Sequence, residues 1–421
     1  MFEQTAVITN AFILIGLALS AATVHRMTPV TRKSLRRLAL ALVAFAAAST
    51  GAHAQSAATP GAAPTGATTP TAATAAGAAT ASPTLGPSRI YVTDWNAGRV
   101  RVFDPKPGPT PGTPHVGNIM VGEGPFGMAV SPDSRRLYVA NSLSDTVSVI
   151  DTRWNVVHYN VGVGDYPIRI AASPDGNRIF VSNLYGNSVS VVWVGNNTTP
   201  WVERTLSIPY KPMEIAVKPG GRFLYVSQYE NQNVKVFDMW NDFAEVDNIF
   251  LGQLGATQPI AFAFTADGSH LYVANEGGGP NDGGTVSFIN TSNSAGNVLE
   301  RTVALPYHHL PRGQMVLTPN GRHLYLPGAG EGKLEVIDTL TGDILNPSNF
   351  IGVGPHGVAL STDGSRLYVS IEGNMLSTVE PGRLSTQGQN PVLCETYVTP
   401  EVAGGTRFLS VAYVTLPSCS F

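Results

Sequence analysis

Cysteine and charged residues are scarce in this 421-residue chain. The only cysteines are Cys394 and Cys419, so the sequence contains neither a cysteine-rich zinc cluster nor a Cys-x-x-Cys-His haem attachment motif. Charged residues make up 13% of the chain, and the formal net charge is −3. General nucleic-acid binding relies on a basic surface, which this composition does not supply. We therefore expect no resident cofactor, no metal site and no general nucleic-acid binding.

Complete catalytic signatures are also missing. The sequence has no Gly-x-Ser-x-Gly nucleophile elbow, no P-loop and no dinucleotide-binding glycine motif in a usable context. These absences remove several large enzyme classes, but they leave open whether the protein is an enzyme at all.

The N-terminal part does not resemble a folded domain. Residues 27–54 contain a basic stretch, then an apolar stretch, then the small-x-small sequence Ala52-His53-Ala54, which is the pattern of a secretory signal peptide. Residues 55–84 are mostly Ala, Thr, Pro, Gly and Ser without charge, which predicts a flexible linker. We therefore expect a periplasmic or secreted protein.

Residues 1–26 admit two interpretations. The segment from Ala6 to Val24 is uncharged, mostly apolar and nearly long enough to span a bilayer. It is either a membrane anchor or an upstream extension, with translation starting at Met27. We favour the extension because the signal peptide from Met27 is already complete. Membrane attachment is expected only if residues 1–26 are retained.

Residues 85–421 carry a repeated pattern of strand and turn signals. An aromatic residue followed by Val or Leu recurs at intervals of 42 to 53 residues, usually after a turn of the Ser-Pro-Asp-Gly type. A repeat of this length is typical of a β-propeller. We predict an all-β, seven-bladed propeller with four strands in each blade. The aromatic anchors are Tyr91, Tyr138, Phe180, Tyr225, Tyr272, Tyr325 and Tyr368.

The first repeat lacks an inner strand, and the C-terminus supplies a candidate. Residues 407–414 have the inner-strand pattern but no repeat after them. We predict that they pair with the Tyr91 strand and close the ring, which removes exposed sheet edges. Cys394 and Cys419 flank this strand, and in an exported protein we expect them to form a disulfide. We expect the closed ring to be a monomer.

Aspartates recur in the predicted turns of the repeats. Asp133, Asp175, Asp267 and Asp363 could be taken for a ladder of metal ligands. Aspartate is a common turn former because its side chain accepts hydrogen bonds from nearby backbone N–H groups. We interpret these residues as turn formers.

The repeats resemble a known family. Leu137-Tyr138-Val139-Ala140-Asn141, followed by the alternating strand of residues 146–151, is similar to the YVTN-type propeller repeat of exported bacterial proteins. More loosely, the repeats resemble seven-bladed lactonase-type propellers, a resemblance that implies activity on lactone rings. Pro327 departs from the motif because proline cannot donate a ladder hydrogen bond, so we expect an irregular blade there.

Two sets of loops should meet at one face of the propeller. One set precedes each inner strand, and the other follows each aromatic-Val strand. Loops on a rigid scaffold commonly carry function, so we expect a ligand in the central funnel between them. The candidate ligand-binding residues are Asp94, Trp95, Tyr166, Tyr210, Glu276, His356 and Glu372.

Catalytic candidates come from two places in these loops and strands. Arg169 and Glu214 occupy equivalent positions, each two residues after a proline, and could form an ion pair that is either structural or functional. His308, His309 and Arg312 share one segment and could act as base and oxyanion clamp, or form only a polar rim. Adjacent histidines point in different directions on a strand, which argues against a shared metal ion.

Three functions remain open from the sequence. We favour an exported, non-catalytic propeller that binds a small molecule or a periplasmic protein at the funnel. The alternative is a lactonase-type hydrolase that uses His308 or His309 together with Arg312, Glu214 and Arg169. A third is an accessory propeller of a periplasmic redox system, whose partner would have to bring the cofactor.

Overall fold

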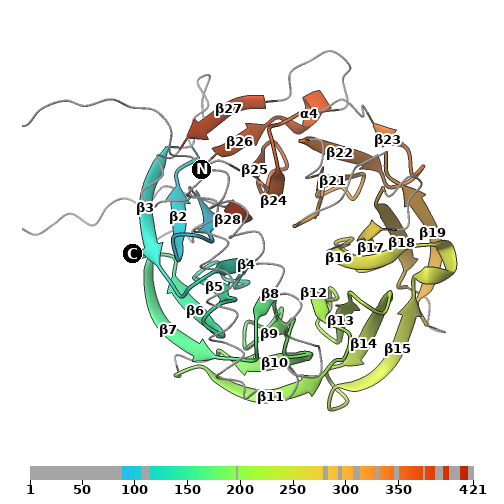
Figure 1. Cartoon of the computed structure of the whole chain (residues 1–421), viewed down its shortest axis with the longest axis horizontal. Helices are drawn as coiled ribbons and strands as arrows, with labels where there is room; N and C mark the ends of the chain where they lie inside the picture. Colours follow the sequence, from blue (N-terminus) through green and yellow to red (C-terminus); the bar gives the residue numbers. More distant parts are fainter. Residues whose placement is uncertain are drawn as a thin grey trace, which may run out of the picture. The chain divides into compact units, whose positions relative to one another are not determined.

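Figure 1 shows a computed structural model of the chain. The structure describes residues 88–105, 114–195, 198–277, 283–292, 296–306, 313–328, 332–345, 350–372, 375–384, 392–397 and 408–415. The predicted extension, signal peptide and linker of residues 1–84 lie outside the described residues. No helix within the described ranges has the length and apolar character needed to cross a membrane.

The described strands form seven four-stranded antiparallel sheets, the blades of a propeller (Figure 1). Blade 1 contains β28 (Phe408–Thr415), β1 (Ser88–Asp94), β2 (Arg99–Phe103) and β3 (His115–Met120). Blade 2 contains β4 (Pro125–Val130), β5 (Arg136–Asn141), β6 (Thr146–Asp151) and β7 (Val156–Gly162). Blade 3 contains β8 (Pro167–Ala172), β9 (Arg178–Asn183), β10 (Ser188–Trp193) and β11 (Trp201–Ser207). Blade 4 contains β12 (Pro212–Val217), β13 (Phe223–Gln228), β14 (Asn233–Asp238) and β15 (Ala244–Phe250).

The remaining three blades follow the same order. Blade 5 contains β16 (Thr257–Phe264), β17 (His270–Gly277), β18 (Thr285–Asn290) and β19 (Val298–Ala304). Blade 6 contains β20 (Val316–Leu317), β21 (His323–Gly328), β22 (Lys333–Asp338) and β23 (Ile344–Leu345). Blade 7 contains β24 (Pro355–Leu360), β25 (Leu367–Ile371), β26 (Met375–Val379) and β27 (Val392–Tyr397). The described residues also include two short helical segments, η1 (Gly252–Leu254) and α4 (Pro381–Leu384).

The first strand of each sheet lies nearest the centre of the ring, and the last lies at the outside (Figure 1). In blade 1 the innermost strand is β28, which pairs with β1 through Ile90↔Tyr413 and Val92↔Val411. The predicted closure by the C-terminal strand is therefore confirmed. Cys394 lies in β27, but Cys419 lies outside the described residues, so the disulfide stays a prediction.

The aromatic anchors form the core between blades. All seven are at most 4% exposed. The hydroxyl of Tyr91 in blade 1 donates to Asn155 Oδ1, in the turn before β7 of blade 2, at 2.8 Å. Tyr225 of blade 4 donates in the same way to Asn297 Oδ1, which precedes β19 of blade 5, at 2.7 Å. Each of these tyrosines thus buries its ring and satisfies its polar end on the next blade.

The turn aspartates have the predicted local role. Ser131 Oγ donates to Asp133 Oδ1 at 2.6 Å, and the backbone N–H of Arg135 donates to the same oxygen at 3.1 Å. Hydrogen bonds of this kind, from Thr265 and Ser361 respectively, lower the pKa of Asp267 and Asp363 to about 2. No cluster of three metal-ligating side chains occurs among the described residues.

Blade 6 is irregular where the proline predicts it. The inner strand β20 pairs with β21 only at Val316↔Tyr325 and Leu317↔Leu324. On its other side β21 stays paired with β22 along its whole length, including Pro327↔Leu334. Pro327 has no N–H to offer, which accounts for the short inner ladder.

Candidate functional site

One face of the ring gathers the loops that precede the inner strands and those that follow the second strands. The register pairs the first residue of an inner strand with the last of the second strand, as in Pro167↔Asn183 and Pro212↔Gln228. We call this the funnel face. The opposite face, which carries the Ser-Pro-Asp turns, is the turn face.

Each fully paired inner strand of blades 2 to 5 and 7 has a register shift just after its first proline. The shifts fall between Pro125 and Met128, Pro167 and Arg169, Pro212 and Ile215, Pro259 and Ala261, and Pro355 and Val358. A β-bulge re-aims the side chain at that point, and bulges are common next to active sites. The side chain that projects at the mouth of the channel is therefore that of the residue two positions after the proline.

Small residues occupy most of these bulge positions because the inner strands approach closely there. A Cβ atom on Gly127 would lie 2.3 Å from the carbonyl oxygen of Ile168, and one on Gly357 would lie 2.8 Å from Ser410 Cα. Gly313 and Ala261 hold the equivalent positions in blades 6 and 5. Of the residues that stand two positions after the proline in blades 2 to 7, only Arg169 and Glu214 have long side chains.

Arg169 and Glu214 form the predicted ion pair. Arg169 Nε lies 3.1 Å from Glu214 Oε2, and the side chains are 5% and 13% exposed. Arg169 Nη2 also donates to the carbonyl oxygen of Gly313 at 2.8 Å, and its guanidinium lies 5.1 Å from the centroid of the Phe126 ring. Gly313 belongs to blade 6, so Arg169 spans the channel from blade 3 to a blade on the far side.

The electrostatics of this pair are unusual. Burial raises the pKa of Glu214 from 4.5 to about 7, and the positive charge of Arg169 only partly opposes that effect. Ser227 Oγ accepts from the backbone N–H of Glu214 at 2.8 Å and so fixes the bulge. Arg169 Nη1 is buried and has no hydrogen-bond partner among the described residues. The site therefore combines the Glu214 carboxyl group, whose pKa lies near neutrality, with a buried N–H donor of Arg169 that has no partner among the described residues.

Aromatic side chains lead from the rim toward this pair. Tyr185 contacts Tyr166 with ring centroids 4.6 Å apart, Tyr166 contacts Trp95 at 6.3 Å, and Trp95 meets Phe126 edge-on at 5.8 Å. The four residues come from blades 1, 2 and 3, and we call them the aromatic shelf. Tyr166 has a φ of 58°, a left-handed conformation that is costly for a tyrosine, and its N–H donates to Asp145 Oδ1 at 3.1 Å.

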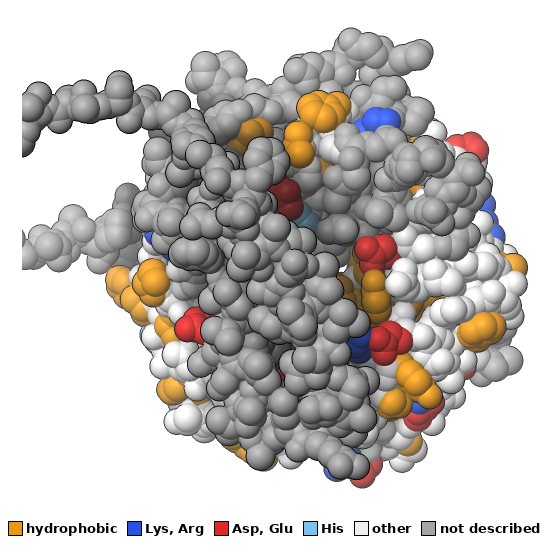
Figure 2. Space-filling view, viewed as in Figure 1, with side chains coloured by type: hydrophobic (Ala, Val, Ile, Leu, Met, Phe, Trp, Pro, Cys, Tyr) orange, Lys and Arg blue, Asp and Glu red, His pale blue; other side chains and the backbone are white. Residues whose placement is uncertain are grey.

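Other predicted residues lie at the same face but farther around it. Tyr229 donates to Glu276 Oε2 at 2.7 Å, and His356 Nε2 lies 3.0 Å from Glu372 Oε1. Tyr210 is half exposed, and the neighbouring Lys211 pairs with Glu230. Figure 2 shows acidic side chains near the centre of the ring, one of them beside a histidine.

Asp94 does not reach the funnel. It is fully buried in blade 1, where its Oδ2 accepts from Arg101 Nε at 2.9 Å and from Arg99 Nε at 3.3 Å. It takes the place of the motif asparagine, which in blade 2 is Asn141 and donates to Ser148 Oγ at 2.9 Å. Asp94 thus links two strands of its own blade.

Several residues that the sequence analysis singled out lie outside the described residues. His308, His309 and Arg312 belong to the segment 307–312, and the glycine-rich insertion lies at 278–282. Sequence reasoning missed Gly313, although it stands two residues after Pro311 and thus matches Arg169 and Glu214 in the repeat. Its carbonyl becomes relevant only once the ring brings blades 3 and 6 face to face.

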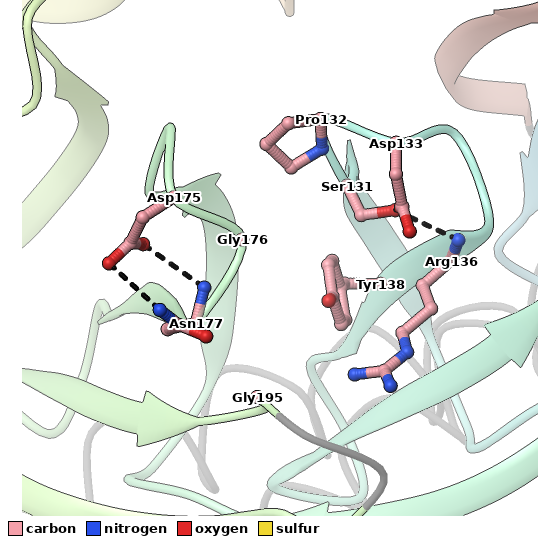
Figure 3. A pocket seen from close by; sticks show the side chains of 9 residues that line it. All are labelled: Ser131, Pro132, Asp133, Arg136, Tyr138, Asp175, Gly176, Asn177 and Gly195. Carbon is pink, nitrogen blue, oxygen red and sulfur yellow. Dashed lines mark hydrogen bonds between the residues drawn. The ribbon is translucent and has the colours of Figure 1, made fainter.

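The turn face also carries hollows, but these follow the repeat. A groove of about 200 Å³ lies between blades 2 and 3. It is lined by Ser131, Pro132, Asp133, Arg136, Tyr138, Asp175, Gly176, Asn177 and Gly195 (Figure 3). Asp175 accepts from the backbone and side chain of Asn177 in its own turn, as the dashed hydrogen bonds show (Figure 3). Asp133 accepts from Ser131 and from the backbone N–H of Arg135 in the same way. Similar grooves occur between blades 3 and 4 and between blades 4 and 5. We interpret them as seams between blades.

Comparison with known proteins decides the family. A family description given as lactonase, 7-bladed beta-propeller, matches residues 67–302, more than half of the chain. The chain belongs to this lactonase family. No curated protein sequence matches it significantly.

Solved structures share the propeller fold at low sequence identity. A Bacteroides fragilis protein described as a candidate 6-phosphogluconolactonase has a TM-score of 0.63 and 17% identity, over 79% of this chain and 99% of that one. A periplasmic gluconolactonase of Pseudomonas aeruginosa has a TM-score of 0.61 and 19% identity, over 78% and 99%. Hydrazine synthase of Kuenenia stuttgartiensis has a TM-score of 0.56 and 21% identity, over 65% and 87%.

Proposed function

We propose that this lactonase-family propeller hydrolyses a lactone at its funnel face, with Arg169 and Glu214 at the reacting centre. The observation that carries the proposal is the pair itself, which combines a carboxyl group that titrates near neutrality with a buried guanidinium. Perturbed pKa values in a cleft are a recognised mark of functional sites. Membership of the lactonase family supports the same reaction class.

The chemistry needs a base and an oxyanion donor. In the proposed reaction the Glu214 carboxylate takes a proton from water as the water oxygen attacks the lactone carbonyl carbon. The Nη1–H of Arg169 donates to the carbonyl oxygen as negative charge develops there. The ring C–O bond then breaks, and the proton held by Glu214 passes to the leaving oxygen. The product is a hydroxy acid, and the carboxylate of Glu214 is restored.

The pKa of Glu214 suits this role. A general base works best when its pKa lies near the working pH, because it is then both ionised and basic enough. At a pKa of about 7, about half of the Glu214 side chains are ionised at neutral pH. Its 13% exposure leaves a path for water. His308, His309 and Arg312 precede Gly313, which Arg169 contacts, and we retain them as candidates for substrate contact.

A binding-only role is the second candidate. Arg169 already contacts Glu214, the Gly313 carbonyl and the Phe126 ring, an arrangement that would also serve as a fixed bridge across the channel. Buried ion pairs often have such structural roles. In this case the funnel would bind a small molecule or a protein partner without turnover.

We also propose export, on the signal-peptide pattern of residues 27–54, and a monomeric state. N-terminal sequencing of the mature protein would show whether cleavage follows Ala54 and whether residues 1–26 are retained. The accessory role in a periplasmic redox system stays a prediction, and a pull-down from periplasm would test it.

The decisive experiment measures hydrolysis of a panel of lactones by the wild type, Arg169→Met and Glu214→Gln. We expect each substitution to lower kcat/KM by about 100-fold or more. Glu203→Gln is the matched control, because Glu203 on the outermost strand β11 pairs with Arg178 of β9 at 2.6 Å, away from the funnel face. A pH profile of kcat/KM that rises with an apparent pKa near 7 supports Glu214 as base. Turnover that both variants retain would refute the proposed site.

A further inference from the structure

The aromatic shelf suggests what kind of ligand enters the funnel. It starts at Tyr185, which is 40% exposed, and ends at Phe126, whose ring lies against the Arg169 guanidinium. Aromatic faces bind the apolar faces of rings and flat groups, and they gain little from fully charged anions. A cyclic ligand lying on the shelf would place one edge at the Arg169–Glu214 pair.

The loops around the shelf are acidic. In the described loops of the funnel face and the strand ends beside them, six carboxylates stand against two lysines, Lys211 and Lys333, and Lys211 pairs with Glu230. The carboxylates are Glu123, Asp145, Asp165, Glu230, Glu276 and Glu372. The strand-borne arginines at this end of the ring are paired as well, Arg169 with Glu214, and Arg99 and Arg101 with Asp94.

Clefts lined by one sign of charge attract ligands of the other sign and repel ligands of the same sign. A phosphate group is recognised by N–H donors and cations, and the cation of these described loops, Lys211, is paired with Glu230.

We propose that the funnel selects lactones with an uncharged ring body and rejects their phosphorylated counterparts. This inference rests on the proposed function and adds the substrate class. The shelf supplies affinity for the ring, and the acidic loops supply discrimination against phosphate. Discrimination of this kind weakens as salt screens the charges.

Binding without turnover tests the inference separately from catalysis. The probes are a six-membered sugar lactam, the amide analogue of a sugar lactone, and its 6-phosphate. We expect the neutral lactam to quench tryptophan fluorescence. At low ionic strength it should bind at least about tenfold more tightly than the lactam 6-phosphate. The ratio of the two affinities should fall as salt is added. Trp95→Phe should remove most of the quenching.

Charge variants sharpen the test. Glu276→Gln combined with Asp165→Asn should improve binding of the phosphorylated lactam, whereas Glu245→Gln with Asp242→Asn, on the outer part of blade 4, should not. Equal or tighter binding of the phosphorylated form by the wild type would overturn the inference, whether or not lactones are hydrolysed. Selective binding of the neutral lactam with no hydrolysis of any lactone would leave the inference standing and remove the proposed function.

Discussion

Replacing Glu214 by glutamine should change how the stability of the protein depends on pH. Burial raises the pKa of Glu214 from 4.5 to about 7 in the folded state. This rise of about 2.5 pH units, at 1.36 kcal/mol per unit, amounts to about 3 kcal/mol. Because the folded pKa lies above the unfolded one, Glu214 contributes this stability below pH 4.5 and loses it as pH rises through 7. Glutamine mimics the protonated form and has no such dependence.

The assay is urea unfolding of both proteins between pH 4 and pH 8.5. We expect the free energy of unfolding of the wild type, minus that of Glu214→Gln, to fall by about 3 kcal/mol across this range, most steeply between pH 5 and 7. Glu203→Gln serves as control, since the partly exposed Arg178 lowers rather than raises the pKa of Glu203. A difference that stays constant, or that grows toward pH 8.5, would show that Glu214 is not held in a raised-pKa environment.

Three further predictions concern the ring. Val411 on the closing strand β28 is 2% exposed, and Val411→Ala should destabilise the protein by about 2 kcal/mol in urea unfolding. Val246 is half exposed, so Val246→Ala should change the stability little. Equal effects of the two substitutions would argue against closure by β28. Gly357→Ala should cost about 1–3 kcal/mol because its Cβ would meet the Ser410 backbone, whereas Gly117→Ala, with open space around it, should be tolerated. Intact-mass measurement with and without reductant should show a gain of two hydrogens if Cys394 and Cys419 are bonded, and no change would exclude that disulfide.

The fold could be predicted from the sequence because each repeat carries its own signals. The aromatic anchors, the Ser-Pro-Asp turns and the unpaired C-terminal strand specify seven blades and their closure, and the structure has both. Pro327 even indicates which blade is irregular, since the effect of a missing N–H is local.

The site was predictable only in part. The ion pair of Arg169 and Glu214 follows from their equivalent places in adjacent repeats. The contact of Arg169 with Gly313 does not, because it joins blades on opposite sides of the channel, which no local pattern encodes. The sequence placed Asp94 in the funnel, yet Arg101 holds it inside blade 1. In the next repeat Asn141 donates to Thr146 and Ser148, which stand five and seven residues after it. Arg99 and Arg101 stand at the same distances after Asp94, so this alignment could have predicted that Asp94 pairs with them.

The most direct test of the account is lactone hydrolysis by the wild type and by Glu214→Gln across pH, corrected for spontaneous ring opening. We predict wild-type turnover whose kcat/KM rises with an apparent pKa near 7, and a loss of about 100-fold or more in the variant together with loss of that pH dependence. A variant as active as the wild type, with the same pH profile, would contradict the central claim that Glu214 is the base of a lactone hydrolase.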